Sequence, residues 1–184
     1  GHEMSDSKWR TKQFVWRELM TPDVEKAKGF YGELFGWTFE EADMGAFKYT
    51  MVHAVGSKTH IGGMMPLSAM PGEVPPCWQS YISDEDVDAT AALAKEHGGS
   101  VMMPPTDIPN VGRFAVLGDG DGAAFTVFRA LTGDGETSER PGLGEFCWET
   151  LSAKDLEAAK KFYPAVLGWA SVPGPGGIDC FAAG

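Results

Sequence analysis

Residues 14–37 carry the first clear pattern of apolar and polar positions in the chain. The first six of these residues mix aromatic or aliphatic with polar side chains, which predicts a half-buried strand. Thr21, Pro22 and Asp23 then place a hydroxyl, a proline and an acid in succession, an order that predicts a helix start. Gly36 is placed to end this helix. The predicted helix carries one apolar stripe, made of Val24, Ala27, Phe30, Tyr31, Leu34 and Phe35.

The chain repeats this stretch 132 positions later, at residues 146–169. Eleven of the 24 positions are identical without a gap. Chance does not produce such a run of aromatic residues and glycines, so the pattern indicates an internal repeat. The identical pairs are Phe14/Phe146, Trp16/Trp148, Leu19/Leu151, Asp23/Asp155, Glu25/Glu157, Ala27/Ala159, Lys28/Lys160, Phe30/Phe162, Tyr31/Tyr163, Gly36/Gly168 and Trp37/Trp169.

Beyond this helix the period of the apolar positions changes to two, which predicts strands. Three short strands are expected at residues 38–41, 47–53 and 61–67, with turns at Gly45 and Gly56. A second strand, helix and three strands follow at residues 78–82, 85–97, 100–103, 112–117 and 123–129. At an offset of 63 positions Asp86 falls on Asp23 and Gly99 falls on Gly36, so the two passes correspond. Residues 119–122 are expected to form a tight turn between the last two strands.

These patterns predict one complete domain and the beginning of another. Residues 14–130 form the complete domain, with modules at 14–70 and 76–130. Residues 131–144 are rich in glycine, hydroxyl and charged residues and are expected to be a linker. Residues 145–184 are expected to start a second domain that is incomplete in this chain.

The two ends of the chain add two expectations. Residues 1–13 are interpreted as an expression-tag scar followed by a frayed N-terminus. In the third copy of the motif, a strand and a helix alone cannot bury the apolar stripe of the helix. Further polypeptide or a partner is therefore expected to cover it. This stripe consists of Leu156, Ala159, Phe162, Tyr163, Val166 and Leu167.

Charge and composition narrow the classes of partner. The formal net charge of −11 disfavours nucleic acid and anionic membranes. No apolar run approaches the roughly 18 residues that a membrane helix needs. Cys77, Cys147 and Cys180 form no CxxC pair, which suits a reducing compartment. We therefore expect a cytoplasmic globular protein without nucleic-acid or membrane partners, and a homodimer is the assembly to consider.

The helix-start acid followed by FYGELFGW, inside a repeated strand–helix–three-strand unit, resembles the vicinal oxygen chelate superfamily. This superfamily includes glyoxalase I, bleomycin-resistance proteins and extradiol dioxygenases. Residues 101–130 resemble the second-module signature of its tandem, glyoxalase-like bacterial members. The resemblance covers residues 14–130 and the start of a second domain. It implies an α+β fold in which paired modules form a curved, cup-shaped eight-stranded sheet with helices outside.

The resemblance also locates the positions that hold a divalent metal in catalytic members. Three of the four ligand positions fall on Trp16, Gln79 and Thr126, and the fourth falls at Gly63 or Met64. Divalent ions prefer His, Asp or Glu, so a tryptophan and a threonine argue against a metal centre. We therefore expect no metal ligands at these positions and no bound cofactor.

A ligand pocket is expected on the face of the sheet that the helices leave open. Residues two apart on a strand share a face, so Trp16 goes with Glu18. The helix stripe is expected to cover the opposite face. The predicted ligand-binding residues are Trp16, Gln79, Tyr81, Thr126 and Phe128.

Glu18 is the candidate catalytic residue. A carboxyl group among aromatic side chains would have a raised pKa and could act as a base. The alternative is that Glu18 forms an ion pair with an arginine such as Arg113. His53 and His60 are seven positions apart, too far for a local chelate, and a lone histidine on a strand is usually structural.

Three functions stay open at this point, and with them the question whether the chain is an enzyme. In the first, the cup binds a small, partly apolar organic ligand without a tightly bound metal, as a binder or as an acid–base enzyme. In the second, Glu18, His53 or His60 replaces the expected ligands in a metal-dependent lyase, isomerase or dioxygenase. In the third, the cup is filled and the chain is a structural or regulatory module.

Overall fold

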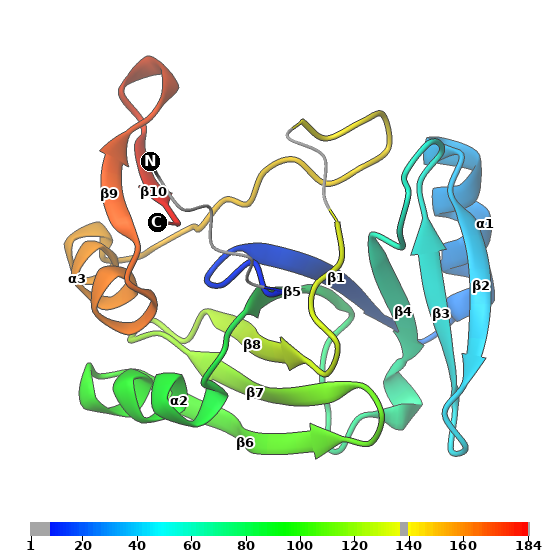
Figure 1. Cartoon of the computed structure of the whole chain (residues 1–184), viewed down its shortest axis with the longest axis horizontal. Helices are drawn as coiled ribbons and strands as arrows, with labels where there is room; N and C mark the ends of the chain where they lie inside the picture. Colours follow the sequence, from blue (N-terminus) through cyan, green and yellow to red (C-terminus); the bar gives the residue numbers. More distant parts are fainter. Residues whose placement is uncertain (1–7, 137–139, 184) are drawn as a thin grey trace. The chain divides into compact units, whose positions relative to one another are not determined.

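The computed structural model describes residues 8–136 and 140–183 (Figure 1). A strand, a helix and three strands occur twice and are followed by a helix and two short strands. The predicted α+β class and the two strand–helix–three-strand modules are confirmed. The elements are β1 (Phe14–Thr21), α1 (Val24–Phe35), β2 (Thr38–Asp43), β3 (Lys48–His53), β4 (Gly62–Pro66), η1 (Leu67–Ala69), β5 (Cys77–Ser83), α2 (Val87–Glu96), β6 (Ser100–Ile108), β7 (Gly112–Gly118), β8 (Ala124–Ala130), α3 (Leu156–Leu167), β9 (Ala170–Pro173), η2 (Pro175–Gly177) and β10 (Asp179–Ala182).

Eight strands form one mixed sheet in the order β2-β3-β4-β1-β5-β8-β7-β6. In each module the first strand pairs in parallel with the last, β1 with β4 and β5 with β8. The remaining pairs within each module are antiparallel. Glu18 lies opposite Gly63, and Tyr81 lies opposite Thr126. Both members of the second pair are 63 positions after those of the first, so the weaker sequence offset is a structural repeat.

The chain folds into two compact units. The first, which we call the α1 unit, comprises residues 16–80 and 135–150. The second, which we call the α2–α3 unit, comprises residues up to 15, residues 81–134 and residues from 151 onward. The domain limits expected from the repeats stay a prediction.

In the α1 unit, helix α1 covers one face of β2, β3 and β4 (Figure 1). Among the twelve residues of α1, all within the described part of the chain, Ala27 alone is buried. Phe30, Leu34 and Phe35 are exposed, so the prediction that the whole stripe packs on the sheet is wrong. The reason is that α1 approaches the strands along its small residue Ala27 and leaves its largest side chains outside. The buried core residues are Leu19, Ala27, Trp37, Val52, Ala54 and Met64.

The N-cap of α1 lies two residues later than predicted. Thr21 is the last residue of β1 and does not cap the helix. Asp23 is the N-cap, because its backbone is extended and its side chain accepts a hydrogen bond from the N–H of Lys26 at 2.9 Å. The predicted end is confirmed. Gly36 has φ 68° and its N–H donates to the carbonyl of Gly32.

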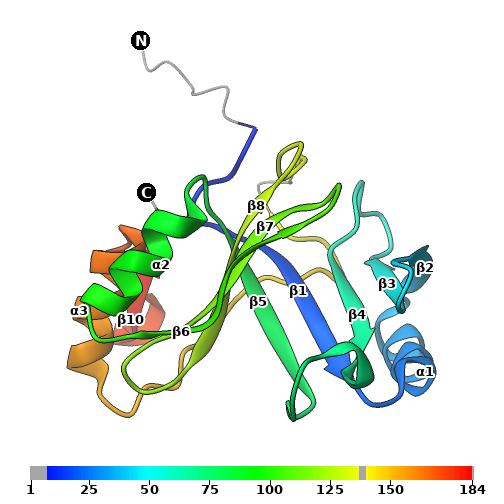
Figure 2. The same ribbon diagram turned by 90° about the horizontal axis from the view of Figure 1, so that it is seen from below.

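The α2–α3 unit has a larger core, in which α2 and α3 lie side by side (Figure 2). Helix α3 buries the residues Ala159, Phe162, Tyr163, Val166 and Leu167. The expectation that the stripe needs further polypeptide or a partner is wrong for these five residues, because α2 and β8 cover them within the same unit. The sixth residue of the stripe, Leu156, is 48% exposed. The core residues contributed by α2 and the sheet are Ile82, Val87, Ala91, Ala94, Ala115, Leu117, Phe125 and Val127.

The third copy of the motif does not form its predicted strand. Residues 145–155 are neither helix nor strand, although residues 146–151 repeat the sequence pattern of β1. A strand requires a partner for its backbone groups. β1 has β4 as its parallel partner, whereas the described residues after α3 contain only β9 and β10, which pair with each other. No counterpart of β4 is therefore present among them.

The turn between β7 and β8 is built as predicted and also fixes α3. The N–H of Gly122 donates to the carbonyl of Asp119 at 3.0 Å. The buried carboxylate of Asp119 accepts the hydroxyl of Tyr163 at 2.8 Å. Burial and then this hydrogen bond raise the pKa of Tyr163 far above its usual range. The acids of this turn therefore position α3.

The described part of the N-terminal segment contacts the α2–α3 unit. Trp9 Nε1 donates to the carbonyl of Ala130 at 2.8 Å, and Lys12 Nζ lies 2.9 Å from a carboxylate oxygen of Asp84. Residues 1–7 of the predicted tag scar and residues 137–139 of the predicted linker lie outside the described residues. Within the described ranges, no helix has the length and apolar character to cross a bilayer.

Candidate functional site

In the α1 unit, three side chains form one hydrogen-bonded chain. Trp16 Nε1 donates to Tyr49 Oη at 2.9 Å, and Tyr49 Oη donates to Glu18 Oε1 at 2.9 Å. Glu18 is only 7% exposed. The adjacent residue Leu19 packs in the core beside α1, so Trp16 and Glu18 share the face of β1 that points away from α1.

Gly63 makes room for this chain. A side-chain carbon built on Gly63 would lie 2.1 Å from Tyr49 Oη, which no real contact permits. Tyr49 therefore occupies the space next to the backbone of β4. Because Gly63 also lies opposite Glu18 in the register, its missing side chain lets the tyrosine hydroxyl reach the carboxylate.

Glu18 also influences Cys77, the first residue of β5. Burial, and then the nearby charge of Glu18, raise the pKa of the Cys77 thiol above its ordinary value. Cys77 is a free cysteine and is half-buried. A protonated thiol therefore lies close to the Trp16–Tyr49–Glu18 chain.

The other predicted binding residues are divided between the two units. Gln79 lies half-buried on β5 within the α1 unit. In the α2–α3 unit Tyr81 lies opposite Thr126, which is 1% exposed. The rings of Tyr81 and Phe128 meet edge to face, with centroids 5.8 Å apart. Each unit thus groups its own candidates, and the common pocket stays a prediction.

The expected metal positions do not fit a divalent ion. The indole N–H of Trp16 is bound to Tyr49, and the register identifies Gly63, which has no side chain, as the fourth position. Gln79 and Thr126 supply neutral oxygen atoms only. Among the described residues, no group of three or more His, Cys, Asp and Glu side chains is arranged to hold a metal. These residues therefore do not reproduce the four-ligand centre of the metal-dependent members.

His53 and His60, named for the metal-dependent alternative, are closer than their separation in sequence indicated. Their ring centroids are 5.8 Å apart, because the loop between β3 and β4 folds back on itself. His60 Nε2 lies 3.2 Å from a carboxylate oxygen of Glu40. The ring contact and the ion pair of this cluster join His53, His60 and Glu40 to one another.

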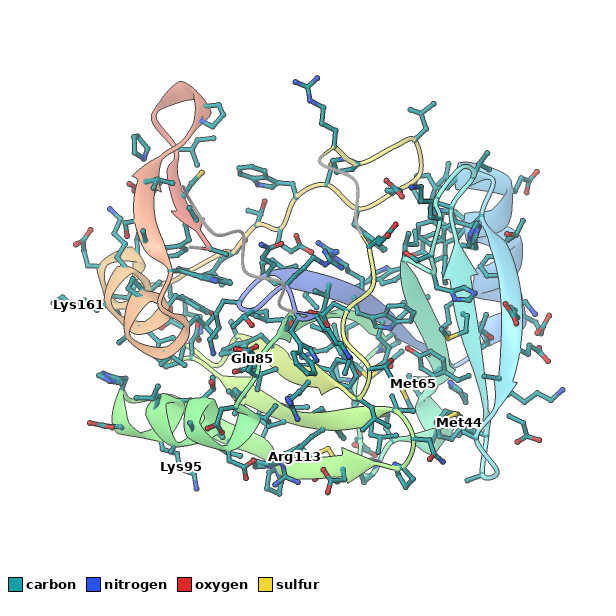
Figure 3. All side chains as sticks on the ribbon, viewed as in Figure 1. Met44, Met65, Glu85, Lys95, Arg113 and Lys161 are labelled. Atoms are coloured by element: carbon teal, nitrogen blue, oxygen red, sulfur yellow. The ribbon has the colours of Figure 1, made fainter. Side chains whose placement is uncertain are left out.

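Arg113, the arginine suggested as a partner of Glu18, has two other carboxylates. Its guanidinium lies 2.8 Å from Asp88 and 3.0 Å from Asp107, on the exposed surface of the α2–α3 unit (Figure 3). The partner of Glu18 shown by the hydrogen bonds of the α1 unit is Tyr49.

Tyr49 is the residue that sequence reasoning missed. Its signal was the pair Gly62-Gly63 inside an expected strand, because glycine in a strand marks a close approach of another group. Chemically, the chain fixes one oxygen of a buried carboxylate with a phenol that is itself oriented by an indole. Such a fixed carboxylate can accept a hydrogen bond or a proton from a bound molecule.

Known proteins with related sequences agree with the motifs. A family model described as the Glyoxalase/Bleomycin resistance protein/Dioxygenase superfamily matches residues 13–127. CFP32 of Mycobacterium tuberculosis, provisionally named a glyoxylase, is 35% identical over 164 residues, covering 88% of this chain and 62% of CFP32. The anthracycline biosynthesis protein DnrV of Streptomyces peucetius is 36% identical over 168 residues, covering 85% of this chain and 60% of DnrV. This chain thus spans less than two thirds of the length of these relatives.

Solved structures show the same fold at low sequence identity. The Mn(II)-bound glyoxalase from Novosphingobium aromaticivorans has a TM-score of 0.61 and 19% identity, covering 88% of this chain and 54% of that one. The 2,2',3-trihydroxybiphenyl 1,2-dioxygenase from Sphingomonas wittichii has a TM-score of 0.56 and 14% identity, covering 88% and 58%. The family model covers more than half of the sequence, and the chain therefore belongs to the glyoxalase/bleomycin resistance protein/dioxygenase superfamily.

Proposed function

We propose that this protein binds a small, partly apolar organic molecule at the hydrogen-bonded side chains of Trp16, Tyr49 and Glu18. The proposed site has no tightly bound metal. The observation that carries the proposal is the pair of 2.9 Å hydrogen bonds that fix the buried Glu18 carboxylate. An aromatic wall with few, fixed polar groups is typical of small-molecule sites. Gln79 would add a polar contact within the α1 unit. Tyr81, Thr126 and Phe128 stay predicted binding residues of the α2–α3 unit.

Glu18 contacts the bound molecule whether the protein is a binder or an acid–base enzyme. In a binder, its carboxylate accepts a hydrogen bond from the ligand. In an acid–base enzyme, it accepts a proton from a substrate held against Trp16. Chemical change of the bound molecule distinguishes the enzyme from the binder.

The ligand class is tested with daunorubicin, a soluble anthracycline, because one relative is named for anthracycline biosynthesis. The planar rings of such a compound suit stacking on an indole. We expect saturable binding that the Trp16→Ala substitution weakens at least ~10-fold, or ~1.4 kcal/mol. The Trp16→Ala protein should lose less unfolding free energy than the ~3–5 kcal/mol that is typical when a buried aromatic residue is replaced by alanine.

Trp148→Ala is the matched control, because Trp148 repeats the position of Trp16 but is 64% exposed. It should change neither affinity nor stability. A Trp16→Ala protein that keeps its affinity but loses several kcal/mol of stability would place Trp16 in the core and refute the site. Stoichiometric metal in the purified protein that disappears in Glu18→Ala would instead favour the metal-dependent alternative.

A further inference from the structure

The α1 unit contains an aromatic pocket that helix α1 helps to form. Its volume is about 380 Å³, which is in the range of small-molecule sites. Five of the side chains that line it are aromatic, and one is a carboxylate. All of them belong to the α1 unit. These side chains are those of Tyr31, Phe35, Trp37, Trp78, Phe146 and Glu145.

The aromatic pocket is separate from the Trp16–Tyr49–Glu18 chain. Trp78 Nε1 donates to Tyr31 Oη at 3.2 Å, and Tyr31 is a residue of α1. Trp78 therefore lies on the face of the sheet that α1 covers. Trp16 and Glu18 share the face of β1 that points away from α1. The two candidate binding sites are thus on different faces and share no residue.

The rings of the pocket meet at steep angles. The ring of Trp78 lies at 80° to that of Tyr31 and at 68° to that of Phe146, with centroids 5.4 and 5.6 Å apart. Rings in this arrangement form the walls of a cage and not a flat stack. Trp37 Nε1 donates to the carbonyl of Gly144 at 2.7 Å. Since both indole N–H groups are bound within the protein, the pocket offers mainly ring surface.

The charge at the pocket is negative. Glu145 accepts the N–H of Gly142 through Oε2, and within the described ranges it forms no ion pair with a lysine, arginine or histidine. The faces of aromatic rings are also electron-rich and attract cations. Phe146 already makes such a contact, because Cζ of Arg17 lies 5.1 Å from its ring centroid. An anion would be repelled by Glu145 and by the net charge of −11.

We propose that the aromatic pocket binds a small organic cation that carries an alkylated ammonium group. The ring faces attract its positive charge, and the alkyl groups bury apolar surface against the rings. Glu145 supplies the opposite charge.

The polar groups of the pocket favour a quaternary ammonium over a primary one. A primary ammonium group has three N–H donors and loses its hydration in an aromatic site unless each donor finds an acceptor. A quaternary ammonium has no N–H to satisfy. The hydroxyl of Tyr31 already accepts the indole N–H of Trp78, and one oxygen of Glu145 accepts a backbone N–H. A cation without donors therefore matches this lining best.

The test compares choline with 3,3-dimethyl-1-butanol, which has the same shape but carries carbon in place of the charged nitrogen. Proton NMR titration of each compound with the full chain follows the methyl signal in the same way for both. Choline should bind saturably with a Kd below ~1 mM. The uncharged alcohol should bind at least ~10-fold more weakly, because it lacks the attraction to the ring faces and to Glu145.

Two substitutions locate the binding. Glu145→Gln keeps the shape of the side chain and removes its charge, and Phe35→Ala removes a ring that is 46% exposed. Each should weaken choline binding at least ~5-fold. Glu33→Gln is the control for charge, because side chains two apart on a helix do not face the same way and Glu33 lies between Tyr31 and Phe35. Phe30→Ala is the control for ring loss, because Phe30 is 59% exposed and does not line the pocket.

Three outcomes would overturn the inference. The first is the absence of saturable choline binding with a Kd below ~1 mM. The second is equal affinity for choline and the alcohol, since the pocket would then select apolar shape and not charge. The third is choline binding that Glu145→Gln or Phe35→Ala leaves unchanged, since the cation would then contact another surface. Trp16→Ala should not alter choline binding, so this site and the one at Trp16 can fail separately.

Discussion

Helices α1 and α3 are each twelve residues long and begin and end in the same way, yet α3 buries five of its residues and α1 buries Ala27 alone. Asp23 and Asp155 cap them by accepting hydrogen bonds at 2.9 and 3.0 Å from an N–H three residues later. Gly36 and Gly168 end them with φ of 68° and 70°. Phe30 is nevertheless 59% exposed, and its identical counterpart Phe162 is 5% exposed.

The difference separates two causes of structure. Caps and helix ends depend on residues within the motif, so they recur wherever the motif occurs. Burial depends on a second element that supplies a complementary face, and α3 has one in α2. Within the α1 unit, α1 packs on its own strands through Ala27 and has no corresponding helix partner among the described residues.

The largest expected difference in stability comes from making the same substitution in both copies of the motif. Phe162→Ala should lower the free energy of unfolding by ~3–5 kcal/mol, because it opens a cavity between α2 and α3. Phe30→Ala should change it by less than ~0.5 kcal/mol, because the ring is mostly in solvent. Urea denaturation followed by circular dichroism measures both values. Similar losses in the two variants would show that Phe30 is buried in solution.

The next test removes one hydroxyl from each copy. Tyr163→Phe deletes the donor to the buried Asp119 and should cost ~1–3 kcal/mol. Tyr31→Phe deletes a half-buried acceptor at 3.2 Å from Trp78 Nε1 and should cost less than ~1 kcal/mol. Equal costs would contradict the conclusion that Asp119 anchors α3.

The pH dependence sharpens the same test. The pKa of Tyr163 is raised in the folded protein by burial and by Asp119. Its contribution to stability is therefore complete below the unfolded value of about 10. Above that pH the unfolded chain loses the proton first, so the contribution falls as pH rises. The stability difference between the wild type and Tyr163→Phe should accordingly shrink above about pH 10.

The order of elements followed from the sequence because each signal was local. The change of apolar period, the capping aspartates and the helix-ending glycines all act within a few residues. What failed depended on contacts between distant segments. The motif at residues 146–151 has the pattern of a strand but no strand to pair with, and the α3 stripe found its cover in a helix some 70 positions earlier.

The candidate site was predictable in part for the same reason. Residues two apart on one strand share a face, so the sequence alone placed Trp16 and Glu18 on the same face of β1. Tyr49 comes from β3, and its position depends on the missing side chain of Gly63 on β4. The contact of Tyr49 with Glu18 requires three strands to meet. The glycine at position 63 is an indirect sign of it in the sequence.

The smallest expected difference concerns the tryptophans that follow the two helices. Trp37 Nε1 donates to the carbonyl of Gly144, and Trp169 Nε1 donates to the carbonyl of Lys12, both at 2.7 Å. Each indole also meets a phenylalanine two positions after its acceptor, with ring centroids 5.7 Å apart for Phe146 and 5.5 Å for Phe14. The contact is thus the same in both copies, whatever the burial of the helix face.

Replacing either tryptophan by phenylalanine should therefore cost about the same. Trp37→Phe and Trp169→Phe each lose one hydrogen bond, worth ~1 kcal/mol, and part of the same ring contact. Their unfolding free energies should differ by less than ~0.5 kcal/mol in urea denaturation. Trp148→Phe, in which the exposed indole of Trp148 is changed, is the control and should leave stability unaltered. A clearly larger loss for Trp169→Phe would mean that the packing of α2 on α3, and not the repeated tryptophan contact, determines how firmly this end of the helix is held.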